Sequence, residues 1–199
     1  MIKYISLDLQ GTLSDSKFSD NFWLEILPQK YSEHFNISID ESKKILKEKF
    51  KEYGVYNILY NDDKYWSEYL GFDTNEELSL SGITPELNKD LFDFINTLDL
   101  PKIIISTTTD LFINAELDDK VNIFDKIYSC VDYFKIGGKT ENVYKTICDE
   151  LNIKPSEMIH IGDNKTMDIE NARKAGVNAI LFDNNTENVI NEIKKLLEV

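Results

Sequence analysis

Residues 4–16 read YISLDLQGTLSDS. The apolar run at the start has the composition of a short β-strand, which we predict over residues 2–7, and Gly11 provides a turn soon after it. The strand therefore ends at Asp8, and a glutamine, Gln10, follows two positions later. An acidic residue at the end of a buried strand directs attention to the other polar side chains that share its edge of the sheet.

Strand and helix patterns alternate from residue 84 onward. Continuous apolar runs, such as KIIIS at 102–106, are typical of strands buried on both faces of a parallel sheet. Thr84 is a candidate helix cap with Pro85 at the first helical position, and Gly176 is a candidate helix end. Together with the first strand, this order predicts an α/β fold with a doubly wound, mostly parallel, Rossmann-like sheet.

Residues 14–82 have a different character, because their apolar residues recur at helical spacing and no strand pattern is convincing. Asp40 is a candidate cap for one of these helices. The division that follows is an α/β core formed by residues 1–13 and 83–199, with an inserted all-helical domain at residues 14–82. We expect most aromatic residues of the insert to form its interior, with one or two facing a ligand: Tyr53, Tyr56, Tyr60, Tyr65, Trp66 and Tyr69.

The composition narrows the range of partners. The 199-residue chain carries 22 basic and 36 acidic residues, a formal net charge of −14. Such a surface repels phosphate backbones and anionic membranes, so we expect neither nucleic acid nor a membrane as partner. Cys130 and Cys148 have no metal-ligand spacing and are expected to be free thiols. Because the first strand follows Met1 at once, we expect no export signal and a cytoplasmic protein, either a monomer or a homodimer.

Ligands of open parallel sheets bind beyond the carboxyl ends of the strands. Asp8, Ser106 and Asp163 each stand at such an end, and Lys139 and Asp168 stand near the starts of helices. Clustered carboxylates repel one another unless a cation lies among them, and oxygen ligands suit Mg²⁺. A lysine and a hydroxyl suit phosphoryl oxygens, and a carboxylate beside them can act as a nucleophile.

Four segments in this order resemble the motifs of the haloacid dehalogenase (HAD)-like hydrolase superfamily. ISLDLQGTL resembles its first motif, IIIST its second, GGKTENVY its third and HIGDNKTMDIENARKAG its fourth. The resemblance covers nearly all of residues 1–13 and 83–199. The helical insert follows the first motif, where members of the C1-capped subgroup carry a helical cap.

The resemblance implies a Mg²⁺-dependent phosphatase that acts on a small phosphorylated metabolite through an aspartyl-phosphate at Asp8. Mg²⁺ would be held by Asp8, Asp163 and the backbone carbonyl of Gln10. Asp168 would orient Lys139 or a water molecule. The implied catalytic residues are Asp8, Gln10, Ser106, Lys139 and Asp168, and the implied substrate contacts are Gly11, Thr12, Ser106, Thr107 and Lys139.

Gln10 departs from the family pattern, because the phosphatases normally have a second aspartate at this position. That aspartate protonates the leaving oxygen and then activates the attacking water. A glutamine cannot exchange protons near neutral pH, and general acid–base catalysis contributes ~10²–10⁴-fold. The enzyme is therefore expected to be slow or specialised, and Gln10→Asp is expected to raise its turnover.

Two alternatives stay open at this stage. One is another hydrolase of the superfamily. Dehalogenases usually have a tyrosine at position 10 and lack the acid found here as Asp163, and phosphonate hydrolases need a cap lysine, for which Lys43 and Lys64 have no matching context. The other alternative is a non-catalytic protein that binds a phosphorylated ligand.

Three further expectations concern the surroundings of the site. His160 lies inside an apolar strand and is expected to be a hydrogen-bonded structural residue, whereas His34 is expected at the surface. The cap is expected to open for substrate and close to exclude water, with hinges near Ser14–Ser16 and Ser79–Gly82.

Overall fold

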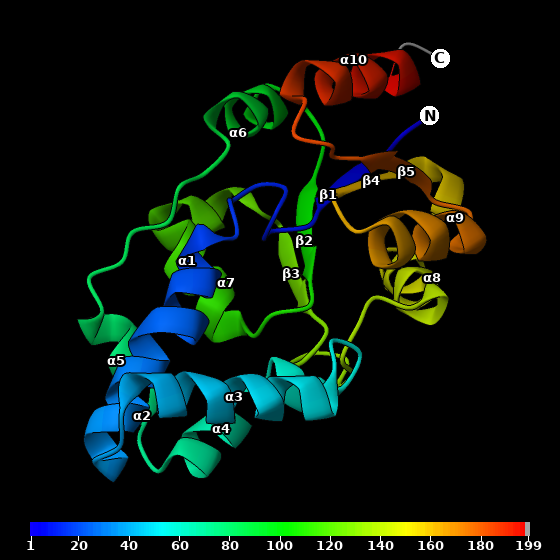
Figure 1. The fold of residues 1–199 in the computed structure, drawn as a ribbon. Helices are drawn as coiled ribbons and strands as arrows, with labels where there is room; N and C mark the ends of the chain where they lie inside the picture. Colours follow the sequence, from blue (N-terminus) through cyan, green and yellow to red (C-terminus); the bar gives the residue numbers. More distant parts are fainter. Residues whose placement is uncertain (198–199) are drawn as a thin grey trace.

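The structure is a computed structural model in which residues 1–197 are described. Its centre is a five-stranded, all-parallel sheet with the strand order β3-β2-β1-β4-β5 (Figure 1). The expected α/β fold with a doubly wound sheet is therefore confirmed. The strands are β1 (Tyr4–Leu7), β2 (Lys102–Ser106), β3 (Lys126–Ser129), β4 (Met158–Gly162) and β5 (Asn178–Leu181).

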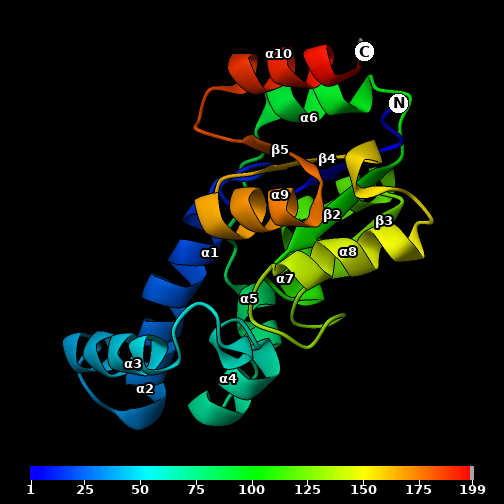
Figure 2. The same cartoon turned by 90° about the vertical axis from the view of Figure 1, so that its right-hand side faces the viewer.

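Helices cover both faces of this sheet (Figure 2). One face packs against α6, α7 and α10, and the opposite face packs against α8 and α9. Short 3₁₀ turns at Asp118–Ile123 and Pro155–Glu157 and a π-helical turn at Lys165–Glu170 complete the connections. The core helices are α6 (Lys89–Asn96), α7 (Asp110–Leu117), α8 (Glu141–Glu150), α9 (Asn171–Ala175) and α10 (Thr186–Leu197).

Burial of both faces explains the unbroken apolar runs of the central strands. In β2, Ile104 packs with the cluster that includes α6 and α10, whereas Ile103 and Ile105 pack with the cluster that includes α8 and α9. Successive strand side chains point to opposite faces, so a strand between two helical layers needs apolar residues at every position. Cys130 and Cys148 are buried free thiols, as expected.

A helical region is inserted between β1 and α6, and it gathers at one end of the sheet (Figure 1). Its elements are α1 (Lys17–Asn21), a π-helical turn (Phe22–Ile26), α2 (Leu27–Phe35), α3 (Ile39–Tyr53), a 3₁₀ turn (Ile58–Tyr60), α4 (Asp63–Leu70) and α5 (Thr74–Leu80). Trp66 is fully buried at the centre of the insert, and Tyr53, Tyr65 and Tyr69 pack against the same cluster. Within the described residues, none of the helices combines the length and the apolar character that crossing a bilayer requires.

Two expected helix caps are wrong. The helix expected to follow a cap at Asp40 begins at Ile39, and its cap is Ser38, two residues earlier, whose side chain accepts a hydrogen bond from the Glu41 amide at 3.2 Å. The helix predicted from Thr84 begins at Lys89, with Asn88 as its cap. Residues 84–88 do not form a first helical turn, because the Asn88 amide donates to the Leu13 carbonyl and the segment pairs with the chain entering the insert.

The two connections between the insert and the core lie side by side, and the two expected hinge segments differ in burial. Within the expected hinge at Ser14–Ser16, Ser14 is buried, bridges to Leu87 and donates a side-chain hydrogen bond to Glu116, which counts against movement at Ser14, whereas Ser16 is exposed. The other expected segment is more open. Ser79 and Gly82 are exposed, and Gly82 has a φ of 66° with open space around it.

Helix α7 belongs to two hydrophobic clusters at once. Its Ile113 and Leu117 pack against the sheet. Its Phe112 packs inside the insert, stacked on Trp23 with 5.4 Å between ring centroids and edge-on to Phe22 at 5.3 Å. The insert is therefore fastened to the core by a side chain of the core itself, as well as by its two connections.

Phe112→Ala should destabilise the protein strongly, because it empties a fully buried site between the two clusters. We expect the free energy of unfolding to fall by about 3–5 kcal/mol. The measurement is urea denaturation followed by tryptophan fluorescence. Phe35→Ala, at a ring that is 47% exposed, is the control and should cost less than about 1 kcal/mol. Equal losses in the two variants would contradict the shared-cluster interpretation.

Candidate active site

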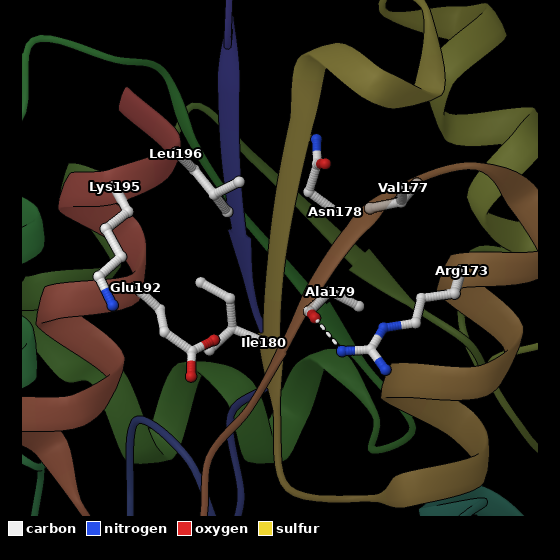
Figure 3. A pocket seen from close by; sticks show the side chains of 8 residues that line it. All are labelled: Arg173, Val177, Asn178, Ala179, Ile180, Glu192, Lys195 and Leu196. Carbon is white, nitrogen blue, oxygen red and sulfur yellow. Dashed lines mark hydrogen bonds between the residues drawn. The ribbon is translucent and has the colours of Figure 1, made fainter. Parts of the chain in front are cut away.

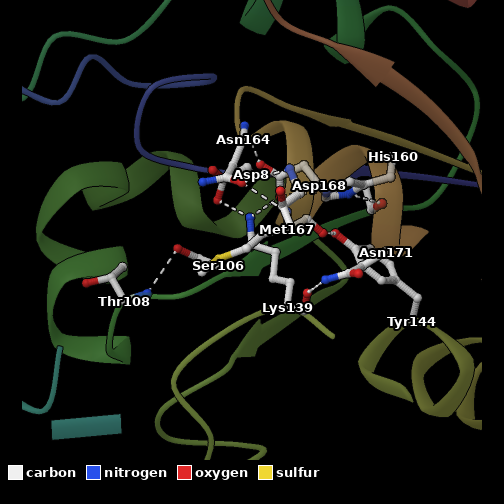
Figure 4. A network of polar contacts seen from close by, with 12 residues as sticks. Asp8, Ser106, Thr108, Lys139, Tyr144, His160, Asn164, Met167, Asp168 and Asn171 are labelled. Atoms are coloured by element: carbon white, nitrogen blue, oxygen red, sulfur yellow. Dashed lines mark hydrogen bonds and ion pairs between the residues drawn. The ribbon is translucent and has the colours of Figure 1, made fainter. Parts of the chain in front are cut away.

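A buried lysine joins two aspartates at the carboxyl edge of the sheet (Figure 4). The Lys139 Nζ lies 2.6 Å from Asp8 Oδ1 and 2.5 Å from Asp168 Oδ1. All three side chains are buried, with Lys139 only 2% exposed. The sequence brings these groups from the end of β1, the loop before α8 and the segment after β4, so the topology confirms that they meet.

Two glycines permit this close assembly. A Cβ on Gly162 would lie 2.3 Å from Asp168 Cγ, and a Cβ on Gly11 would lie 2.5 Å from Asp163 Oδ2. Gly11 also has a φ of 81°, which other residues adopt at a cost. The carboxylates can therefore sit directly against the backbone only because glycine occupies both positions.

Asp168 is held by several partners, and its own role follows from them. Its Oδ1 accepts from Lys139 and lies 3.2 Å from His160 Nε2, while its Oδ2 accepts from the Asn164 amide at 2.9 Å. The His160 Nδ1 in turn lies 2.8 Å from Ser6 Oγ. Asp168 thus orients Lys139, and His160 is a fully buried, hydrogen-bonded structural residue as expected. His34 is exposed, also as expected.

The charges of the cluster shift one another's pKa values. Burial raises the pKa of Asp8 to about 8, although Lys139 opposes this shift. Burial alone would lower the pKa of Lys139, but the Asp168 and Asp8 carboxylates raise it above its usual value, so the lysine stays charged. Burial also raises the pKa of Asp168, but Lys139 and His160 outweigh it and hold that pKa below its usual range. The site therefore contains a permanent cation, Lys139, and a carboxylate, Asp8, whose ionised form a second cation would stabilise.

The donor set fits a hard divalent cation. One carboxylate oxygen from each of Asp8, Asp163 and Asp168 lies within 4.8 Å of the others. Because Asp168 is occupied by Lys139, His160 and Asn164, Asp8 and Asp163 are the carboxylates available to a metal such as Mg²⁺. Burial raises the pKa of Asp163, and the Asp168 carboxylate adds to that shift, as expected for clustered acids, although Lys139 opposes it.

The other predicted substrate contacts follow β1 and β2. Ser106 is buried at the end of β2, and its Oγ accepts from the Thr108 amide at 3.3 Å, while Thr107 is half-buried. Gly11 and Thr12 line a cavity of about 590 Å³ together with Asp163. Among residues 1–197, Thr12 Oγ1 is one of two buried side-chain oxygens or nitrogens without a hydrogen-bond partner. A polar ligand at this edge of the sheet would supply a hydrogen-bond partner for Thr12 Oγ1.

Sequence reasoning missed one residue of the site, Glu116 on α7. It is 1% exposed, and both of its oxygens accept hydrogen bonds, from Gln10 Nε2 and from Ser14 Oγ at 2.5 Å. Burial raises its pKa to about 7. The available signal was its spacing: Glu116 follows Phe112 by four positions and Ile113 by three, so a charged residue falls on an apolar helix face.

A second cavity joins the insert to the site. It has a volume of about 520 Å³, Gln10 lies at its core end, and its walls come from the insert. Three aromatic residues line it, Trp23, Phe50 and Tyr60, together with Lys47 and Lys51. The insert also reaches the loop before Lys139, because a Cβ on Gly137 would lie 2.2 Å from the Tyr56 carbonyl oxygen.

Another cavity, of about 420 Å³, lies away from the acidic cluster (Figure 3). It is formed by α9, β5 and α10, and Arg173 in its wall donates to the Ala179 carbonyl at 2.9 Å. None of the predicted site residues lines it.

The comparisons with known proteins agree with this architecture. The family model described as haloacid dehalogenase-like hydrolase matches residues 2–176, and the chain belongs to this family of hydrolases. A GMP/IMP nucleotidase of Escherichia coli (strain K12), YrfG, is 27% identical over 94 residues, which are 47% of this chain and 42% of the relative. The match therefore spans less than half the length of that relative.

Solved structures show the same fold. A HAD phosphatase from Thermococcus onnurineus superposes with a TM-score of 0.78 at 16% identity, covering 92% of this chain and 87% of the other. A 2-haloacid dehalogenase from Pseudomonas syringae pv. Tomato DC3000 superposes with a TM-score of 0.60, also at 16% identity, covering 92% and 87%. Both kinds of hydrolase share the fold, so the chemistry has to be argued from the site.

Glu116→Gln should gain stability relative to the native protein as the pH rises from about 4.5 to about 7. Burial raises the pKa of Glu116 from 4.5 to about 7, so the folded protein binds this proton more tightly than the unfolded chain. Its contribution to stability is complete below about pH 4.5 and is lost as the pH rises through about 7. Relative to the native protein, the variant should therefore gain about 3 kcal/mol between these limits. Urea denaturation across this range measures the difference, and a gap that does not change with pH would contradict the shift.

Proposed function

We propose that the protein is a Mg²⁺-dependent phosphatase that hydrolyses a small phosphorylated metabolite through an aspartyl-phosphate at Asp8. The observation that carries this proposal is the buried Lys139 held between Asp8 and Asp168. Lys139 is a fixed positive charge beside Asp8, whose ionised form is costly to bury. Such a charge suits a site that must receive the negative charge of a phosphoryl group.

In the first step an Asp8 oxygen attacks phosphorus while the bond from phosphorus to the leaving oxygen breaks. The electron pair of that bond stays on the leaving oxygen, which takes a proton from solvent. Lys139 neutralises charge on the phosphoryl oxygens, and Ser106 at the end of β2 donates to one of them. Mg²⁺ held by Asp8, Asp163 and the Gln10 backbone carbonyl would supply further positive charge there.

The cavity between the insert and Gln10 suits the leaving group. Its aromatic walls, Trp23, Phe50 and Tyr60, favour the face of a planar ring, and Lys47 and Lys51, which outnumber Asp20 in the same lining, favour an anionic substrate. The name of the distant relative, a GMP/IMP nucleotidase, supports the same substrate class. We therefore extend the proposal to nucleoside monophosphates.

The dehalogenase alternative finds less support. Asp163 joins the acidic cluster, and a dehalogenase without a metal needs no such acid. Lys43 pairs with Glu25 at 2.5 Å, and the exposed Lys64 lies 4.0 Å from Asp132. Neither of these lysines lines the cavity next to Gln10, whereas Lys47 and Lys51 do, so the cap lysines by themselves do not separate a phosphatase from a phosphonate hydrolase.

A phosphomonoester panel with and without Mg²⁺ tests the proposal. We expect slow turnover that needs Mg²⁺ and is abolished in Asp8→Asn, because the amide is a poor nucleophile. Binding of beryllofluoride, which mimics a phosphoryl group on an aspartate, gives a readout that is independent of turnover. If the protein neither hydrolyses a panel member nor binds beryllofluoride, the non-catalytic binding alternative replaces this proposal.

Nucleoside 5′-monophosphates should be better substrates than glycerol phosphate. Stacking on the aromatic walls should raise kcat/KM about tenfold, and Tyr60→Ala should remove most of that preference. The control is Tyr133→Ala, at an exposed ring that does not line this cavity. Equal kcat/KM values for both substrate classes would contradict a stacking role of these walls.

A further inference from the structure

Gln10 occupies the position of the family's acid–base aspartate, and its side chain has a buried partner. Its Nε2 donates to Oε1 of Glu116, and the other oxygen of Glu116 accepts from Ser14 Oγ at 2.5 Å. Glu116, on α7, is 1% exposed. Gln10 lines two cavities, the one that contains Asp163 and the one whose walls come from the insert. The amide of Gln10 therefore stands between a buried carboxylate and the space where substrate would lie.

This contact fixes which end of the amide faces the site. In its ionised form Glu116 accepts hydrogen bonds and donates none, so it pairs with the Nε2 end of Gln10. The Oε1 end is then left as the acceptor. Ser14 holds the carboxylate from its other side, and Ser14 is itself anchored by the pairing of residues 13–15 with residues 86–88.

Resting on the proposed function above, we propose that Glu116 is a positioning residue that turns the Gln10 amide so that Gln10 Oε1 accepts a hydrogen bond from the water that hydrolyses the aspartyl-phosphate. The pair of a glutamine and a buried glutamate thus takes the place of a single aspartate. It supplies orientation of the water without proton exchange.

The step balances without a base at position 10. The water oxygen forms a bond to phosphorus, the bond from phosphorus to the Asp8 oxygen breaks, and its electron pair returns to the Asp8 carboxylate. Both protons of the water leave with the product as dihydrogen phosphate. Gln10 gains no proton and loses none, so its contribution is the direction of the attacking lone pair.

The same contact explains why an aspartate at position 10 would not suit this chain by itself. A carboxylate there would face the Glu116 carboxylate in a buried setting, and like charges in such a position repel. The expectation from sequence alone, that Gln10→Asp raises turnover, therefore changes. The exchange should help only when Glu116 becomes a glutamine at the same time.

The first experiment follows the phosphoenzyme in Glu116→Gln. An amide at position 116 accepts and donates equally well, so Gln10 is no longer held in one orientation. We expect kcat to fall about tenfold, and the fraction of acid-quenched protein carrying phosphate on Asp8 at steady state to rise, because hydrolysis of the intermediate is the slowed step. Beryllofluoride binding should be unchanged. The control is Glu150→Gln, which removes the same charge from α8 and should leave all three readouts unchanged.

The second experiment exchanges the two groups. Gln10→Asp alone should turn over no faster than the native protein, whereas the double variant Gln10→Asp/Glu116→Gln should exceed the single variant by about tenfold or more, because it contains an acid–base carboxylate with an amide donor beside it. A single variant as active as the double variant would overturn the proposal.

The outcomes separate this inference from the proposed function. If native protein forms phosphoenzyme and binds beryllofluoride, but Glu116→Gln leaves the phosphoenzyme fraction unchanged or lowers it, the positioning role is wrong and the phosphatase proposal stands. If native protein forms no phosphoenzyme and does not bind beryllofluoride, both proposals are wrong.

Discussion

The ion contacts of Lys139 are the constraint on which the site depends. Removing an ammonium group and two carboxylates from water costs several kcal/mol per ion, and only good geometry offsets that cost. Here Asp168 is fixed by His160 and the Asn164 amide, so Lys139 is aimed at Asp8 before any ligand arrives. The arrangement is also incomplete, since burial still raises the pKa of Asp8. A second cation and an anionic group are the natural complements to this charge distribution.

The sheet brings these groups together because all its strands are parallel. Asp8, Ser106 and Asp163 leave three neighbouring strands at one edge, where the order β2-β1-β4 places Asp8 in the middle. Gly11 and Gly162 then let two carboxylates approach the backbone closely. A nucleophile on the central strand is thus reached by groups from both sides, which a hairpin-built sheet would not provide.

The apolar runs and their alternation with helices predicted the sheet, because burial on both faces leaves a clear pattern in Ile103, Ile104 and Ile105. The site residues that follow strand ends, Asp8 and Asp163, were equally accessible to sequence reasoning. Glu116 left only the signal of a charged residue on an apolar helix face, and its role was not readable from that signal, because its partners Gln10 and Ser14 are about a hundred positions away and meet it only in the fold. The helix start at Thr84 was mispredicted for a related reason, since pairing with the chain near Leu13 overrides the local preference of a Thr-Pro pair.

Helix α7 contributes Ile113 to the sheet cluster, Phe112 to the interior of the insert and Glu116 to the contact with Gln10. The insert and this helix therefore pack as one unit, although 29 residues of sequence lie between the end of α5 at Leu80 and the start of α7 at Asp110. A chimaera that received a foreign cap in place of residues 14–82 would keep Phe112 but lose the aromatic residues of the insert that surround its ring. Recombination between relatives should succeed only where the crossover points carry α7 along with the cap.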